Sequence, residues 1–78
     1  MSVTVKYFAS LREHVGVAQQ QFLLPVSGCN AIELWVLVNP SIKLADNSLV
    51  AINQNYAAFD AVVNDGDEIA FFPPVAGG

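Results

Sequence analysis

The stretch FFPPVAGG, residues 71–78, decides where the folded part of the chain ends and where an extended terminus begins. Its two aromatic residues are typical of the end of a strand. Pro73 and Pro74 have no backbone N–H and a fixed φ, so they cannot continue a central sheet ladder. We therefore expect the last strand to end at Phe72, and residues 1–72 to form one folded domain.

The residues after that strand, 73–78, are expected to form a flexible C-terminal Gly-Gly tail. A Pro-Pro pair favours extended geometry, and six residues at about 3.1–3.3 Å each reach about 18–20 Å, enough to enter another protein's cleft. The final glycines have no Cβ and suit a channel too narrow for a side chain. The residues expected to insert are Pro73, Pro74, Val75, Ala76 and Gly77. The group delivered is the carboxylate of Gly78.

Several segments together resemble a known family. A small domain ending in Gly-Gly is similar to the ubiquitin-like proteins. The tail, the acidic DGDEIA segment (65–70), the FA-S-LRE start (8–13) and the IN-Q piece (52–54) resemble the small, sulfur-carrying subunit of molybdopterin synthase. The residue pattern alone indicates α+β. The resemblance implies a ubiquitin-like β-grasp: a mixed sheet of four or five strands, its N-terminal and last strands parallel and central, with one main helix packed across it.

The resemblance also implies chemistry at Gly78. A free α-carboxyl group has a pKa of about 3.3–3.7, so at neutral pH it is an anion and a poor electrophile. In the family, a ubiquitin-activating-like adenylyltransferase uses ATP to adenylate the terminal glycine, which is then converted to a thiocarboxylate. The sulfur passes to cyclic pyranopterin monophosphate in the large synthase subunit, during molybdenum cofactor biosynthesis. Carried over, Gly78 holds the adenylate and then the thiocarboxylate.

The partners implied are therefore the large synthase subunit, the adenylyltransferase and a sulfur donor enzyme, with no cofactor bound to this chain itself. Other functions compete. A sulfur carrier for the thiazole of thiamine also ends in Gly-Gly, although Pro73-Pro74 favours the molybdopterin carrier. A protein modifier would be conjugated to lysine through Gly78, as ubiquitin is. An interaction module with an accidental Gly-Gly end is the fourth alternative.

Composition narrows the class of partner. The chain has 78 residues, 54% of them hydrophobic, which is more apolar surface than so small a core hides, so some is expected to meet partners. A formal charge of −4 argues against nucleic acid and favours a basic protein surface. The longest apolar run, Leu34–Val38, is far shorter than the roughly 18 residues needed to cross a bilayer. With no signal-peptide layout at the start, we expect a cytoplasmic protein without membrane contact.

The first and last strands carry the expected interface. Val3, Val5 and Tyr7 alternate with polar residues and are expected to face the core, which leaves Phe8 on the outer face. In the last strand, Ile69 and Phe71 are expected to point inward, and Ala70 and Phe72 outward. The residues predicted to contact a partner are Phe8, Arg12 and Phe72. The alternatives are isolated surface aromatics and a solvated arginine.

Residues 31–38, AIELWVLV, are almost wholly apolar, so periodicity does not separate helix from buried strand. The β-branched residues favour a strand. We predict a helix, because Asn30 and Glu33 have the spacing of a capping box and Asn39-Pro40 can end it. Ile32, Val36 and Trp35 are expected to cover the sheet.

The remaining elements are predicted from local signals. They are a short helix from Ala9 to Val15 stopped by Gly16, a strand from Gln19 to Leu24 that buries Phe22 and Leu24, a loop over 40–48, a strand from Leu49 to Ile52, a turn over 53–55, a short strand from Tyr56 to Phe59, and a tight turn over 64–67 in which Gly66 has a positive φ.

Catalytic machinery of the chain's own is not expected. His14 is the sole histidine and has no nucleophile or paired acid beside it in the sequence. Cys29, the sole cysteine, is interpreted as a small half-buried residue near a helix start, with a sulfur-carrying role as the alternative. Asp65, Asp67 and Glu68 suggest a metal site, but a solvated turn explains them, so no metal is predicted.

Overall fold

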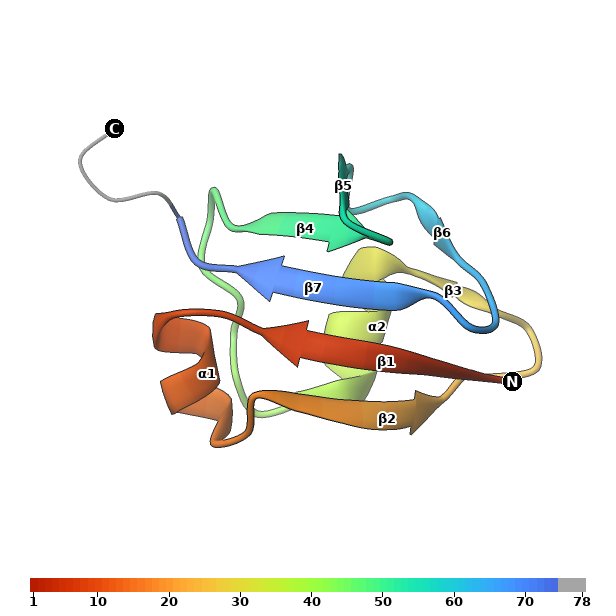
Figure 1. The fold of residues 1–78 in the computed structure, drawn as a ribbon, viewed down its shortest axis with the longest axis horizontal. Helices are drawn as coiled ribbons and strands as arrows, with labels where there is room; N and C mark the ends of the chain where they lie inside the picture. The colour runs from red at the N-terminus through yellow and green to blue at the C-terminus, as the bar shows by residue number, and fades with distance from the viewer. Residues whose placement is uncertain (75–78) are drawn as a thin grey trace.

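The computed structural model describes residues 1–74. In chain order the elements are β1 (Ser2–Tyr7), α1 (Ser10–Val15), β2 (Gln19–Leu23), β3 (Cys29–Asn30), α2 (Ala31–Val38), β4 (Leu49–Ile52), β5 (Asn55–Ala57), β6 (Val62–Val63) and β7 (Glu68–Phe72). A sheet forms one layer, and α2 crosses its rear face (Figure 1). Within this described part, neither helix is long and apolar enough to span a membrane.

The main sheet has five strands in the order β2-β1-β7-β4-β5. Strands β1 and β7 are parallel, with Tyr7 opposite Phe71, while the other neighbouring pairs are antiparallel. The expected mixed sheet with the N-terminal and last strands adjacent at its centre is therefore confirmed. Because β1 and β7 are parallel, both terminate at the same end of the sheet, beside α1 (Figure 1).

The core lies between the sheet and α2, as the alternation in β1 and β7 predicts. Val3, Val5 and Tyr7 are at most 2% exposed, and Phe71 is fully buried. Aromatic rings meet edge to face at its centre, with centroids 5.0 Å apart for Trp35 and Phe71 and 6.0 Å for Tyr7 and Trp35. Such contacts add to the stabilisation from burial.

Polar groups in this core are paired. The Tyr7 hydroxyl accepts hydrogen bonds from Asn39 Nδ2 at 3.0 Å and Gln20 Nε2 at 2.8 Å. The Trp35 indole N–H donates to the Ile42 carbonyl at 2.7 Å, which ties the loop after α2 to the helix. No buried side-chain nitrogen or oxygen in residues 1–74 lacks a partner, so the core carries no uncompensated polar side chain there.

Helix α2 begins where predicted but buries a different face. Asn30 Oδ1 accepts from the Glu33 N–H, and Glu33 Oε1 accepts from the Asn30 N–H, both at 2.9 Å, so the capping box is confirmed. The prediction that Ile32 and Val36 cover the sheet is wrong, since they are 39% and 57% exposed. The buried residues are Ala31, Leu34 and Trp35. A helix that is apolar on all sides has no pattern that selects its inner face.

The hairpin after β4 corrects the predicted bounds of the return strand. Asn53 and Gln54 have φ of 52° and 70°, the pattern of a two-residue hairpin turn. The return strand therefore starts at Asn55 and ends at Ala57, instead of running from Tyr56 to Phe59. Phe59 packs against the core beyond the strand.

Other local predictions agree closely with the structure. Gly16 caps α1 in the left-handed region, with φ 94° and its N–H on the Arg12 carbonyl. Gly66 has φ 82° in the turn before β7. Leu24 is buried and Phe22 partly buried, although β2 ends at Leu23. The short β3–β6 pair was not anticipated, because two-residue strands have no usable period.

Candidate functional site

The candidate site is the end of the sheet at which β1 and β7 terminate and the tail, residues 73–78, begins. Strand β7 ends at Phe72, as the two prolines predict, and Pro74 is exposed. The Phe8 N–H donates to the Phe71 carbonyl at 3.2 Å, so the β1–β7 pairing continues one residue beyond β1. The ladder thus fixes Phe8 next to the start of the tail.

Two aromatic rings stack at this end of the sheet, on its outer face, which is the face away from α2. The rings of Phe8 and Phe72 lie 4.7 Å apart between centroids and are tilted by only 10°. Phe8 is 42% exposed although it is in contact with Phe72. The two residues predicted from separate ends of the chain therefore form one exposed patch.

Tyr56 extends this patch and was not foreseen. Its ring lies 5.9 Å from that of Phe72, tilted by 55°, and the residue is 74% exposed. Tyr56 is opposite Ala51 on β4, and Ala51 is opposite Ala70 on β7. Directly opposed residues share a face of a sheet, so a correct hairpin register would have placed Tyr56 on the outer face. We call Phe8, Tyr56 and Phe72 the aromatic face.

The aromatic face borders a shallow hollow of about 300 Å³ on the sheet. Its lining residues are Lys6, Phe8, Ala51, Gln54, Tyr56, Glu68, Ala70 and Phe72. Lys6 Nζ and Glu68 Oε1 form an ion pair of 3.0 Å at its rim, with both side chains about one-third exposed. The small alanines leave room above the strands, so this surface can accept an apolar side chain of a partner.

The other residues predicted for the site lie in different places. Arg12 is exposed on α1, which begins two residues after Phe8, and within residues 1–74 it has no salt-bridge partner. Pro73 is partly buried at the end of the sheet. Residues 75–77, predicted to insert, and Gly78, predicted to be the reactive residue, lie outside the described residues, so their roles stay predictions.

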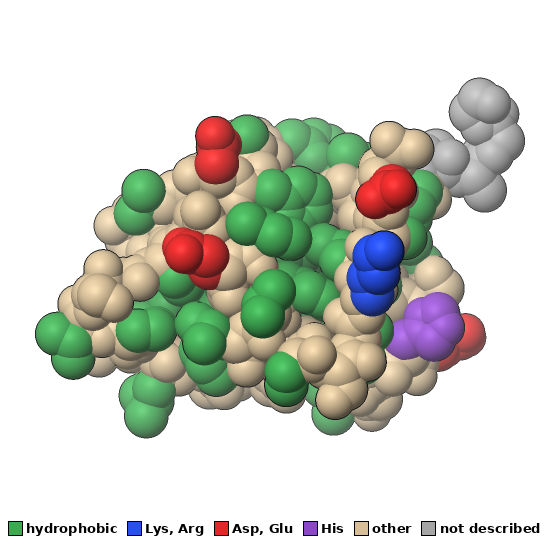
Figure 2. All heavy atoms as spheres, turned by 180° about the vertical axis from the view of Figure 1, so that it is seen from behind, with side chains coloured by type: hydrophobic (Ala, Val, Ile, Leu, Met, Phe, Trp, Pro, Cys, Tyr) green, Lys and Arg blue, Asp and Glu red, His purple; other side chains and the backbone are tan. Residues whose placement is uncertain are grey.

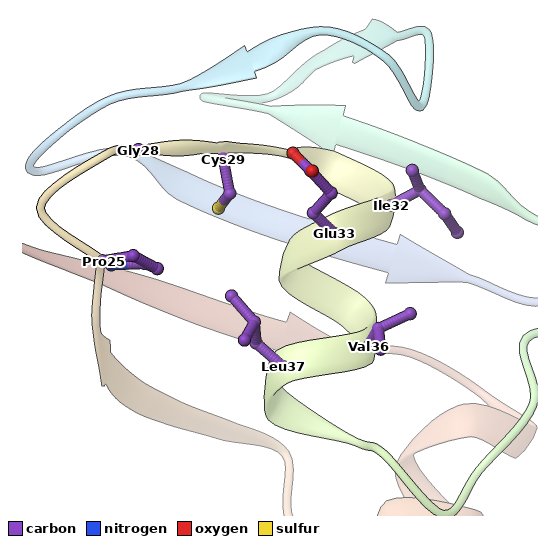
Figure 3. A pocket seen from close by; sticks show the side chains of 7 residues that line it. All are labelled: Pro25, Gly28, Cys29, Ile32, Glu33, Val36 and Leu37. Carbon is purple, nitrogen blue, oxygen red and sulfur yellow. The ribbon is translucent and has the colours of Figure 1, made fainter.

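Cys29 belongs to a separate surface on the helix side. Figure 2 shows hydrophobic side chains gathered on that side among scattered acidic ones. A groove of about 430 Å³ lies there, lined by Pro25, Gly28, Cys29, Ile32, Glu33, Val36 and Leu37 (Figure 3). Burial, and then the nearby Glu33 carboxylate, raise the pKa of the Cys29 thiol. A raised pKa lowers the thiolate fraction, so this thiol is poorly suited to carry sulfur.

The three carboxylates near β7 have structural partners. Asp65 Oδ1 accepts from the Ser2 N–H at 2.7 Å, and Asp67 Oδ2 accepts from the Asn64 N–H at 2.8 Å. Glu68 pairs with Lys6. They therefore stabilise the turn and its contact with β1. Among residues 1–74, no group of three potential metal ligands occurs.

The chain is similar to known proteins over nearly its whole length. A family model described as the ThiS family matches residues 5–78. The chain belongs to the ThiS family. It is 36% identical to the molybdopterin synthase sulfur carrier subunit of Escherichia coli K12, over 97% of this chain and 99% of that protein.

Solved structures agree on the fold. The putative molybdopterin converting factor subunit 1 of Pyrococcus furiosus has a TM-score of 0.77 and 28% identity, over 96% of this chain and 99% of that one. The small archaeal modifier protein 1 of Haloferax volcanii has a TM-score of 0.77 and 26% identity, over 95% and 98%. This member of the ThiS family therefore has the expected ubiquitin-like β-grasp fold, in the α+β class.

Proposed function

We propose that this chain is the sulfur carrier of a molybdopterin synthase and carries its sulfur as a thiocarboxylate on Gly78. One structural observation supports this most. The parallel pairing of β1 and β7 brings Pro73 to the edge of an exposed aromatic face. A partner that binds this face receives the tail in a defined place. The E. coli relative, similar over nearly its full length, is itself named as a sulfur carrier subunit.

The chemistry takes place at the tail's terminus. A carboxylate oxygen of Gly78 attacks the α-phosphorus of ATP in the adenylyltransferase, and pyrophosphate leaves. Hydrosulfide supplied by the sulfur donor then attacks the acyl carbon and displaces AMP, which leaves the thiocarboxylate and releases one proton. In the synthase, the thiocarboxylate sulfur forms a bond to a carbon of cyclic pyranopterin monophosphate, and water then cleaves the bond between the acyl carbon of Gly78 and that sulfur, which restores the carboxylate and leaves the sulfur on the pterin. In each cycle the terminal group of Gly78 is converted from a carboxylate to a thiocarboxylate and back.

The folded body contributes binding and positioning. The aromatic face and the alanine-floored hollow offer apolar area to the large subunit, while the fixed start at Phe72 limits where the tail can reach. Holding a reacting group in place lowers the entropic cost of reaction. Acid–base groups, ATP and the pterin belong to the partners in this proposal, and the chain acts as a carried co-substrate.

Intact mass spectrometry tests the proposal. The chain is incubated with its adenylyltransferase, ATP and a sulfur donor, and the mass is expected to increase by the difference between one sulfur and one oxygen atom. Omitting ATP is the control. If the mass stays unchanged with an adenylyltransferase shown to be active, or if the natural chain continues beyond Gly78 untrimmed, the proposal is wrong.

A second candidate is a protein modifier joined to lysine through Gly78. The similarity to the small archaeal modifier protein 1 favours it. Incubation with cell extract and ATP would then give ladders of isopeptide-linked products, which a pure sulfur carrier does not form. A carrier for the thiazole of thiamine would also gain sulfur, so transfer to the pterin in the presence of the large subunit separates these two carriers.

A further inference from the structure

Strand β2 is an edge strand of the main sheet, and residues 17–24 carry no feature that prevents pairing with another chain. Among residues 1–74 it is paired with β1 only, and Figure 1 shows it as the outermost strand on its side. Edge strands of natural proteins usually carry lysine, proline or a bulge that prevents pairing with another chain. Residues 17–24, VAQQQFLL, contain no charge and no proline. Nothing in this run guards the edge.

The hydrogen-bond register shows which backbone groups are free. The Tyr7 N–H donates to the Ala18 carbonyl at 3.0 Å, and the Leu24 N–H donates to the Met1 carbonyl at 2.9 Å. In an antiparallel pair the hydrogen-bonded positions alternate, so even-numbered residues of β2 bond to β1. The N–H and C=O groups of Gln19, Gln21 and Leu23 therefore point away from the sheet. All three residues are exposed.

We propose that β2 is a self-association surface, on which the β2 strand of a second copy pairs in antiparallel fashion. A two-fold axis at Gln21 places Gln21 opposite its own copy and Gln19 opposite Leu23. These are the positions whose backbone groups face outward, so every free group between Gln19 and Leu23 gains a partner. Pro25 comes next but one after Leu23 and has no N–H, which ends the ladder.

The absence of charge on β2 explains why a second copy can bind at this edge. The chain has a formal charge of −4, so most contacts between two copies bring like charges together. Pairing through β2 avoids this, because residues 17–24 are uncharged. The contact also covers Leu23, which is 76% exposed. A two-fold contact uses the same edge of both copies and closes on itself, so it gives a dimer and not a fibre.

The dimer is compatible with the carrier function. Phe72 is on β7, two strands in from this edge, and stacks on Phe8. Joining two sheets edge to edge leaves their outer faces uncovered. Each copy would keep its aromatic face and the start of its tail available. Dimerisation therefore rests on β2 alone and can be tested apart from sulfur transfer.

Disulfide cross-linking tests the register directly. In a Cys29→Ser background, Gln21→Cys places two thiols at the two-fold axis. Opposed hydrogen-bonded residues have Cα atoms about 5.5 Å apart, within the range that a disulfide bridges. The matched control is Thr4→Cys, since Thr4 is directly opposite Gln21 on β1 and accepts a hydrogen bond from it at 2.7 Å. Both variants lose that bond, but only Gln21 is at the edge.

Mild oxidation is expected to give a covalent dimer from Gln21→Cys and only background from Thr4→Cys. Equal cross-linking of the two variants, or none in either, overturns the proposal. If neither variant cross-links, two copies do not pair through β2, and a strand of another protein is the alternative occupant of this edge.

Sedimentation equilibrium gives an independent measurement. The mass of the natural chain is expected to rise from 8.4 kDa towards twice that value as its concentration increases from micromolar to millimolar. Gln21→Pro removes an outward N–H from each copy and is expected to weaken the dimer about 10- to 100-fold, or about 1.4–2.8 kcal/mol. Proline is tolerated where an edge N–H faces solvent, and circular dichroism checks the fold. A natural chain that stays at 8.4 kDa throughout contradicts the proposal.

Discussion

Removing the stacked rings of Phe8 and Phe72 from the aromatic face by mutation tests whether this surface serves binding more than folding. The changes are Phe8→Ala, Phe72→Ala and the double variant. The rings are stacked with centroids 4.7 Å apart, and Phe8 remains 42% exposed. If the face exists for a partner, truncation should reduce the affinity for the proposed partner, the large synthase subunit, far more than it reduces the stability of the free chain.

The structure sets the expected magnitudes. Full burial of a phenylalanine side chain contributes about 1.5–3 kcal/mol, so Phe8, which buries a little over half of its surface, should lose about 1–2 kcal/mol on truncation. The stacked pair itself should contribute a coupling of about 0.5–1.5 kcal/mol in the double-mutant cycle. For a domain of this size, a loss of about 1 kcal/mol lowers the melting temperature by about 4–8 °C.

Binding should respond more strongly. An aromatic anchor at the centre of an interface typically contributes about 2 kcal/mol or more, so each variant should bind the large subunit about 30-fold more weakly or worse. Urea unfolding measures the coupling, and calorimetric titration measures the affinity. Val62→Ala is the control, because Val62 is 67% exposed on β6, away from this face.

Two results would refute the reasoning. A coupling below about 0.3 kcal/mol would mean that the rings do not stabilise each other. An affinity loss no larger than that of Val62→Ala would mean that the partner binds elsewhere.

Three further predictions concern the tail, the core and the cap of α2. Appending one residue after Gly78 should leave the melting temperature unchanged and abolish sulfur loading, measured by intact mass; a loaded extended chain would contradict the proposed chemistry. Tyr7→Phe should cost about 1–3 kcal/mol in urea unfolding, because the buried Asn39 amide loses its acceptor. Burial raises the pKa of Tyr7 above its ordinary value of 10.0, so in the native protein this tyrosine favours the folded state below pH 10 and that contribution is lost as pH rises above 10. Tyr7→Phe should therefore show a weaker alkaline loss of stability, and an unchanged pH profile would argue against the assignment. Asn30→Ala should cost about 0.5–2 kcal/mol through loss of the α2 cap, measured by thermal unfolding, whereas no loss would mean that the capping box does not stabilise the helix.

Local signals predicted much of the fold. Two successive prolines cannot donate to a ladder, so the last strand had to end at Phe72. The spacing of Asn30 and Glu33 located the start of α2, and Gly66 marked a turn that needs a positive φ. The alternation of β1 identified Val3, Val5 and Tyr7 as core residues. These rules act over a few residues, so the sequence is enough to apply them.

The site was only partly predictable. Phe8 and Phe72 were identified as outward-facing from alternation, but their contact depends on β1 and β7 being neighbours, a pairing of residues more than 60 positions apart. Tyr56 was missed because its face depends on a hairpin register set by Asn53 and Gln54.

The sequence by itself determined the end of β7 at Phe72, the cap of α2 at Asn30 and the turn at Gly66, since each depends on the sterics or hydrogen bonding of adjacent residues. Only the tertiary structure decided which side of α2 is buried. Ile32 and Val36 are as apolar as Leu34, yet they remain exposed because the sheet contacts one stripe of the helix. It also decided that Phe8, Tyr56 and Phe72 meet beside the tail, because distant strands must pair before their side chains can share a surface.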